Sequence, residues 1–135
     1  MNKKRERWGF TLVELMVVIL IVGILAAVAV PILRGRISQA KWSEAAATAG
    51  AIRTAVRAYF AEDPVTAGGW TSQAVTGVQT TLGFTSGDLT GRYFTAANFT
   101  IASVDSNGNA TINVAAPTGL SGTGVLSNSG WVYTP

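Results

Sequence analysis

The 135-residue sequence contains no cysteine and no histidine. The first absence excludes disulfide bonds and thiolate chemistry, and the second removes the side chain that most often acts as a general base or binds a transition metal. Charged residues make up only 13% of the chain, whereas globular proteins carry about 25%. Because the few carboxylates are scattered along the chain, they form no catalytic or metal-binding motif. We therefore predict that the protein is not an enzyme and uses no cofactor or metal ion.

Positive charge is concentrated at the start of the chain. The formal net charge is +3, and residues 1–9 alone hold four basic side chains and one acidic side chain. Residues 10–135 hold six of each sign. The isoelectric point of about 9.7 therefore reflects one short segment. With no basic patch elsewhere, we expect neither a nucleic-acid partner nor a small-molecule substrate.

A long hydrophobic run follows this basic segment. Residues 15–33 are 19 residues without a charge, close to the ~20 that a helix needs to cross a bilayer. Gly23 and Pro31 interrupt the run, but both residue types are tolerated in membrane helices. The basic residues before it predict a cytoplasmic N-terminus, because cytoplasmic flanks carry an excess of positive charge.

The same run allows a second interpretation, a cleaved secretory signal peptide. The small residues at positions 26–29 would then supply the cleavage site. A signal peptide, however, has an apolar stretch of about 7–15 residues. This run is longer, and Glu14 lies directly before its start. We therefore favour a membrane-spanning helix.

The pattern beyond residue 33 is amphipathic. Small, aliphatic and aromatic side chains recur every three or four residues, which places them on one face of a helix. These positions are Trp42, Ala45, Ala49, Ile52, Val56 and Tyr59. Arg53 and Arg57 lie off this face, so we expect both to be dispensable for packing. Asp63-Pro64 ends the helix, because proline disfavours helical backbone in the preceding residue.

We thus predict one helix over residues 11–62. Its first half belongs in lipid and its second half against a protein domain. For Trp42 there is an alternative position at the membrane interface, where tryptophan is enriched.

The rest of the chain, residues 63–135, is rich in glycine and threonine and has few charges. Apolar and polar residues alternate on both sides of Asn107-Gly108, a pair typical of tight hairpin turns. This pattern predicts a β-hairpin with strands at residues 98–104 and 110–115. The turn offers oxygen ligands at alternating positions, as calcium loops do, but no bidentate glutamate follows. We therefore favour a plain hairpin turn.

The remaining segments are less regular. Residues 131–133 are a candidate third strand, and either 78–84 or 92–95 is a candidate edge strand. Loops are expected at residues 64–90 and 116–130. The predicted fold class is α+β, with a long N-terminal helix, membrane-spanning in its first half and amphipathic in its second, packed against a small antiparallel β-sheet.

Residues 9–14, Gly-Phe-Thr-Leu-Val-Glu, follow a basic segment and precede the uncharged run. This arrangement resembles the N-terminal signature of the type IV pilin superfamily, which includes pilins and the pseudopilins of type II secretion and DNA uptake. The resemblance implies that a prepilin peptidase cleaves between Gly9 and Phe10. Residues 1–9 would be the leader peptide that is removed.

The resemblance also implies roles for individual residues. Phe10 would be N-methylated, and Glu14 would contact the N-terminal amine of a neighbouring subunit during assembly. Gly23 and Pro31 would be points of helix flexibility. A local role for Glu14 is open as well, because Thr11-x-x-Glu14 matches a capping box, in which the glutamate bonds back to the backbone at the helix start.

The resemblance further implies a division of the chain. Residues 10–33 would form the membrane-spanning and filament-core half of the helix. Residues 34–135 would form the globular domain, with the amphipathic helix half at 34–62 and the loops and sheet at 63–135. The precursor would be a single-pass protein of the cytoplasmic membrane, and the processed chain a subunit of an extracellular filament. Expected partners are copies of this chain, the membrane, the prepilin peptidase and the filament assembly machinery.

Three functions are therefore considered. The first is a structural subunit of a type IV pilus-like surface filament that serves adhesion, motility or secretion. The second is a pseudopilin of a type II secretion or DNA-uptake system; the scarcity of acidic residues beyond position 63 counts against the calcium site that many major pseudopilins carry. The third is a monomeric membrane-anchored binding module.

Overall fold

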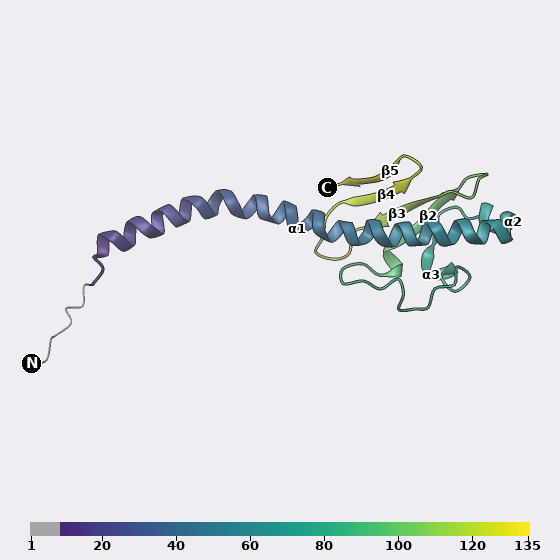
Figure 1. Cartoon of the computed structure of the whole chain (residues 1–135), viewed down its shortest axis with the longest axis horizontal. Helices are drawn as coiled ribbons and strands as arrows, with labels where there is room; N and C mark the ends of the chain where they lie inside the picture. The colour runs from purple at the N-terminus through teal and green to yellow at the C-terminus, as the bar shows by residue number, and fades with distance from the viewer. Residues whose placement is uncertain (1–8) are drawn as a thin grey trace, which may run out of the picture. The chain divides into compact units, whose positions relative to one another are not determined.

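A computed structural model of the chain describes residues 9–135. The described chain divides into two compact units, one ending at Ile37 and the other spanning Ser38–Pro135. The helix α1 (Leu12–Glu62) belongs to both, and Pro31 lies inside it. The predicted helix over residues 11–62 is thus confirmed to within one residue. Figure 1 shows α1 as the first helix of the chain.

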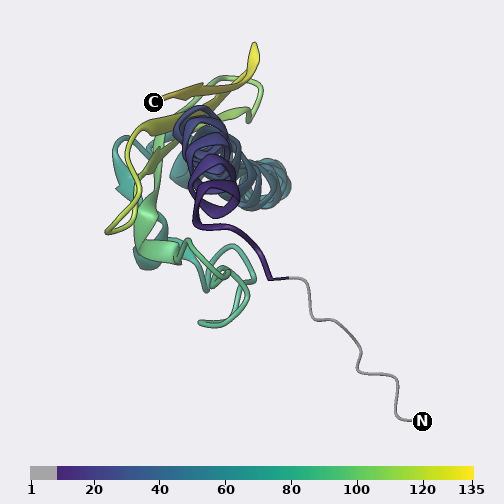
Figure 2. The same cartoon turned by 90° about the vertical axis from the view of Figure 1, so that its left-hand side faces the viewer.

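The second unit combines the later part of α1 with a five-stranded sheet. All strand pairs are antiparallel, and the strand order β1-β2-β3-β4-β5 follows the chain, so the sheet is a simple meander. The elements after α1 are α2 (Pro64–Gly68), β1 (Gln73–Ala74), α3 (Val75–Val78), the 3-10 helix η1 (Ala96–Asn98), β2 (Phe99–Val104), β3 (Ala110–Ala115), β4 (Thr123–Ser127) and β5 (Gly130–Thr134). Figures 1 and 2 show β4 and β5 on one side of this part of α1 and the loops before β2 on another. The predicted α+β fold is confirmed.

The core of this unit lies under one face of α1. The buried helix residues are Trp42, Ala45, Ala49, Ile52 and Val56. They belong to one hydrophobic cluster with Phe99, Ile101, Ile112 and Val114 of the sheet. The predicted face is therefore confirmed. Because burial removes apolar surface from water, this cluster is the main source of the unit's stability.

The ends of the buried face also have aromatic partners. Trp42 is only 2% exposed, and its ring centroid lies 5.0 Å from that of Phe94. The alternative position for Trp42 at a membrane interface is therefore wrong, since the ring is enclosed by protein. At the other end, Tyr59 stacks on Trp70 with ring centroids 5.3 Å apart.

The predicted hairpin is confirmed as β2 and β3. Its turn brings the amide of Gly108 to the carbonyl of Asp105, at 3.0 Å. Gly108 has a φ of +77° and lies so close to Phe60 that a Cβ there would be 2.7 Å from the ring. Only glycine combines this backbone conformation with so little space. The turn therefore closes the hairpin against the end of α1.

Two predictions about the strands were wrong. Residues 116–130 were expected to form a loop, but they contain β4, which pairs with both β3 and β5. The edge strand is β1 rather than 78–84 or 92–95, and it is only two residues long. β1 is too short, and β4 with its glycine too irregular, to show a clear alternation of apolar and polar residues. Pairing with neighbouring strands determines their conformation instead.

Residues 64–90 also contain helices where loops were expected. Asp63-Pro64 ends α1 as predicted, but Asp63 then begins α2. Its Oδ1 accepts the amide hydrogen of Thr66 at 3.0 Å, which caps the new helix. The proline lies in the first turn of α2, where its missing N–H costs nothing.

The expectation that Arg53 is dispensable for packing was wrong. Its Nη1 donates to the Ser127 carbonyl at 3.0 Å, and its Nη2 donates to Asn128 Oδ1 at 2.6 Å. Asn128 Nδ2 in turn donates to Asp105 Oδ2 at 3.1 Å. One chain of hydrogen bonds thus joins α1 to the β4–β5 turn and to the β2–β3 turn.

Candidate processing and assembly site

The first residues of α1 form the capping arrangement that the sequence predicted. The amide of Glu14 donates to Thr11 Oγ1 at 3.2 Å, and the amide of Thr11 donates to Glu14 Oε2 at 2.9 Å. The Thr11 hydroxyl also donates to Glu14 Oε2, at 2.8 Å. These bonds satisfy backbone donors that the first helical turn leaves without partners, so the capping box is confirmed.

Gly9 and Phe10 lie directly before this cap, outside the helix. Phe10 is 83% exposed, and apart from the adjacent residues nothing in the described part of the chain lies within 4 Å of where a Gly9 Cβ would be. The peptide bond between them is therefore in non-helical, accessible backbone, as cleavage requires. Cleavage and N-methylation themselves stay predictions.

Gly23 and Pro31 both lie within continuous helix. Apart from the backbone of its own helix, nothing among residues 9–135 lies within 4 Å of where a Gly23 Cβ would be, so packing within these residues does not require the glycine. The proline lacks the amide that would bond one turn back. Helix flexibility at these two positions stays a prediction.

Among residues 10–37, all apolar side chains are exposed. An 18-residue window of α1 has a mean hydropathy of 3.1 and none of it is buried. By length and composition this helix can cross a membrane. Water is a poor solvent for such a surface, so the side chains need lipid or other protein to cover them.

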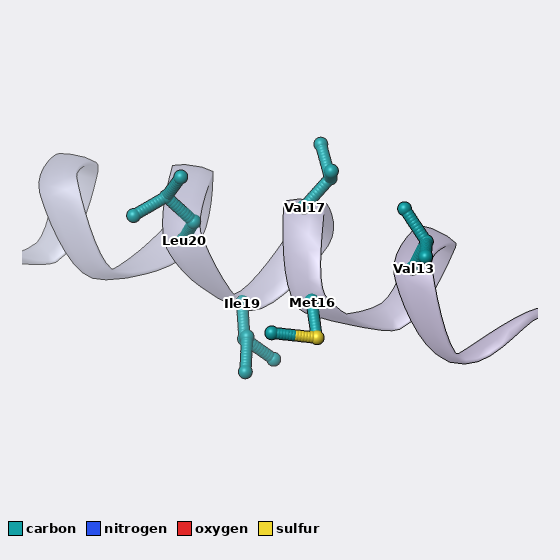
Figure 3. A pocket seen from close by; sticks show the side chains of 5 residues that line it. All are labelled: Val13, Met16, Val17, Ile19 and Leu20. Carbon is teal, nitrogen blue, oxygen red and sulfur yellow. The ribbon is translucent and has the colours of Figure 1, made fainter.

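Figure 3 shows a shallow apolar depression on this helix, lined by Val13, Met16, Val17, Ile19 and Leu20. Val13, Val17 and Leu20 project to one side, while Met16 and Ile19 project to another. All five side chains come from one helix, with nothing facing them. The depression is therefore the space between neighbouring side chains and gives no reason to expect a bound small molecule.

The Asp105 carboxylate, the centre of the calcium alternative, is surrounded by N–H donors. Its Oδ1 accepts from the amides of Asn107 and Asn109 at 2.9 and 2.8 Å, and its Oδ2 accepts from the Asn109 and Asn128 side chains at 3.1 Å each. These hydrogen bonds lower the pKa of Asp105 to about 2. The largest effect comes from the backbone amide of Asn109, followed by the side chains of Asn109 and Asn128. Donors in these directions occupy the places where a cation would bind, so the residues do not fit calcium.

Sequence reasoning missed the partners of Glu44. Its Oε1 accepts from the amides of Tyr93 and Phe94, both at 3.0 Å. Burial raises the pKa of Glu44, but hydrogen bonds from the backbone of Phe94, Tyr93 and Arg92, with the charge of Arg92, outweigh it and lower the pKa. The partners are about 50 positions away in the chain, so no local pattern could reveal them.

Comparison with known protein families identifies a motif at the start of the described chain. The family described as prokaryotic N-terminal methylation motif matches residues 9–30. This segment includes the cap, the proposed cleavage bond and most of the apolar run. The fold and the motif together define a protein with a prepilin-type N-terminus and a C-terminal α+β unit.

The relatives are pilus proteins. The chain is 44% identical over 62 residues to the fimbrial protein EcpC of Eikenella corrodens, covering 46% of this chain and 40% of that protein. It is 46% identical over 54 residues to the type IV major pilin protein PilA of Myxococcus xanthus, covering 40% and 24%. It is 52% identical over 52 residues to the type IV major pilin protein PilE of Neisseria gonorrhoeae, covering 38% and 31%. No solved structure matches.

The chain is thus similar to fimbrial proteins and type IV major pilins, and its N-terminal segment matches the methylation motif. The chain spans less than half the length of these relatives. Relatives of this kind favour a structural rather than an enzymatic role.

Proposed function

We propose that this protein is the structural subunit of a type IV pilus-like filament. The observation that carries the proposal is the combination, in residues 9–30, of the methylation motif with an apolar helix whose side chains are not covered by any other part of residues 9–135. As a precursor, the chain would cover this surface with lipid. In the filament, copies of the same helix would cover it instead.

In this proposal the leader is removed between Gly9 and Phe10, and Phe10 becomes an N-methylated N-terminus. Glu14 then has two uses. It caps its own helix in the isolated chain, and in the filament it binds the N-terminal amine of a neighbouring subunit. A carboxylate inside a bilayer costs roughly 2.5–3.5 kcal/mol on insertion scales, which a charged partner would offset.

The proposed location follows from the same features. The precursor crosses the cytoplasmic membrane once, with its basic N-terminus in the cytoplasm, and the processed chain is exported into a surface filament. The prepilin peptidase and the filament assembly machinery are the partners that such a route requires. The names of the relatives, fimbrial protein and major pilin, favour a filament over a secretion pseudopilin or a monomeric module.

The test is mass spectrometry of the native N-terminus together with electron microscopy of material sheared from cells. We expect filaments whose subunit begins at Phe10 with one added methyl group. Gly9→Val should leave the precursor uncleaved in the membrane, whereas Gly35→Ala, at another glycine with open space for a Cβ, should be processed normally. Filaments built from chains that still begin at Met1 would refute the processing step. Absence of the protein from all sheared material, with normal processing, would favour the pseudopilin.

A further inference from the structure

Two basic side chains of the second unit converge on one exposed aromatic ring. The Nζ of Lys41, on α1, lies 5.0 Å from the ring centroid of Tyr93. The Cζ of Arg92, in the loop before η1, lies 5.6 Å from the same centroid. Tyr93 is 39% exposed. We call these three residues the Tyr93 patch.

The patch carries a surplus of positive charge. Glu44 is the carboxylate that reaches this loop, and it is engaged by the amides of Tyr93 and Phe94. Asp88, in the same loop, accepts the amide hydrogen of Thr85 at 2.7 Å within its own turn. Glu44 offsets one of the two positive charges, and the remaining charge would attract an external anion such as a phosphate group.

Charge is also unevenly distributed along the unit. Lys41 lies near the first residue of the unit, and Arg34 and Arg36 precede it in the chain. The acidic residues Glu62 and Asp63 lie at the far end of α1, about 30 Å away at 1.5 Å per residue. Lys41 and Arg92 therefore lie at the end of the unit that follows the apolar run, with Glu44 beside them, whereas Glu62 and Asp63 lie at the other end.

Chain connectivity limits how far the start of the second unit can lie from the membrane. The uncharged run ends at residue 33, and the second unit begins at Ser38. Five residue steps span at most about 18 Å even when fully extended. A membrane-inserted run therefore keeps Ser38, the first residue of the second unit, close to the lipid headgroups.

The same end presents aromatic rings with polar tips. The ring centroid of Tyr133 lies 5.0 Å from that of the buried Trp42. Tyr133 and its neighbour Trp131 are only partly buried. Such rings prefer the boundary between lipid and water, because one end is apolar and the other forms hydrogen bonds.

We propose that, in the membrane-inserted precursor, the Tyr93 patch docks onto anionic phospholipid headgroups. Lys41 and Arg92 bind the phosphates, and the Tyr93 ring lies at the headgroup level. The docking holds the folded unit against the membrane until the subunit leaves it. This inference rests on the proposed function, because it requires the apolar run to be inserted in lipid.

The absence of cysteine allows single spin labels to be attached at chosen positions of the full chain. Thr90→Cys places a label two residues before Arg92, and Ala61→Cys places a matched label on the exposed far end of α1. Val22→Cys reports insertion of the run. Each labelled chain is reconstituted at high lipid excess in vesicles of phosphatidylcholine alone or mixed with phosphatidylglycerol. The measured quantity is the paramagnetic relaxation of the lipid phosphorus nuclei, and for position 22 the accessibility of the label to oxygen.

We expect the label at position 90 to relax the phosphorus nuclei strongly in the mixed vesicles and weakly in phosphatidylcholine, with little effect from position 61 in either. Each basic residue near an anionic surface strengthens binding roughly fivefold. The double variant Lys41→Gln, Arg92→Gln should therefore weaken the docked state roughly 25-fold. Arg57→Gln, which removes an exposed charge elsewhere on α1, should leave the relaxation unchanged. Melting temperatures of the variants check that they fold.

The outcomes separate the two proposals. If the label at position 22 lies in the hydrocarbon, but the effect at position 90 depends neither on anionic lipid nor on the two charges, the docking is overturned and the membrane stage stands. If the effect disappears when the protein is diluted further in lipid, the patch binds a second copy of the chain and the docking is likewise overturned. A label at position 22 that lies outside the hydrocarbon overturns both.

Discussion

Truncating Ile52 tests the assignment of the buried face of α1. Ile52 has 0% of its surface exposed and lies in the middle of the core cluster. Ile52→Ala removes three carbon groups, which at ~0.8 kcal/mol each corresponds to about 2.4 kcal/mol of lost burial. The cavity left behind adds to this loss, so the expected destabilisation is about 2–5 kcal/mol.

The assay is thermal unfolding of the chain from residue 38 onward, followed by circular dichroism. In a domain of this size, 1 kcal/mol corresponds to roughly 4–8 °C, so Ile52→Ala should lower the melting temperature by at least about 8 °C. Arg57→Ala, on the exposed side of the same helix, is the control and should change stability by less than about 0.5 kcal/mol. If the two variants melt alike, or if the unmutated unit is unfolded without residues 1–37, the reasoning about this face is refuted.

Three further predictions concern polar groups. Arg53→Ala should destabilise the unit by about 1–2 kcal/mol through its two lost hydrogen bonds, more than Arg57→Ala does; equal melting temperatures would show that these bonds contribute nothing. Asp105 has a folded-state pKa of about 2, below the ordinary aspartate value of 3.8, so its contribution to stability should be complete above about pH 4 and be lost as the pH falls toward 2. Asp105→Asn should lack this loss, and a variant that keeps the pH profile of the unmutated chain would contradict the assignment. Glu14→Leu should insert normally into the membrane, because removing a carboxylate makes insertion easier. It should nevertheless yield few filaments, because the N-terminal amine of the neighbouring subunit loses its partner. Normal filaments in electron micrographs, at normal expression, would show that Glu14 only caps its own helix.

The local features of this protein could be predicted because each depends on neighbours in the chain. The cap formed by Thr11 and Glu14 follows from a threonine and a glutamate three residues apart, and the end of α1 follows from Asp63-Pro64. The β2–β3 hairpin follows from alternation around a turn that requires glycine at position 108. The motif in residues 9–30 likewise needs no tertiary contact to be recognised.

The features that were missed depend on contacts between distant parts of the chain. The Trp131 ring packs so closely on Gly124 of β4 that a Cβ there would overlap it. The roles of Glu44 and Arg53 depend on partners about 50 and 75 positions away. Periodicity says only that a charged residue lies off the buried face of a helix; it does not say what lies opposite.

The sequence by itself therefore determined the prepilin-type N-terminus, the long helix, its buried face and the central hairpin, because periodicity, capping and turn chemistry act over a few residues. Only the tertiary structure decided the number of strands, the engagement of Glu44 and Arg53, and the convergence of Lys41 and Arg92 on Tyr93. The physical reason is that strand pairing and the partners of polar groups are chosen among segments that folding brings together, and a linear pattern carries no record of which segments meet.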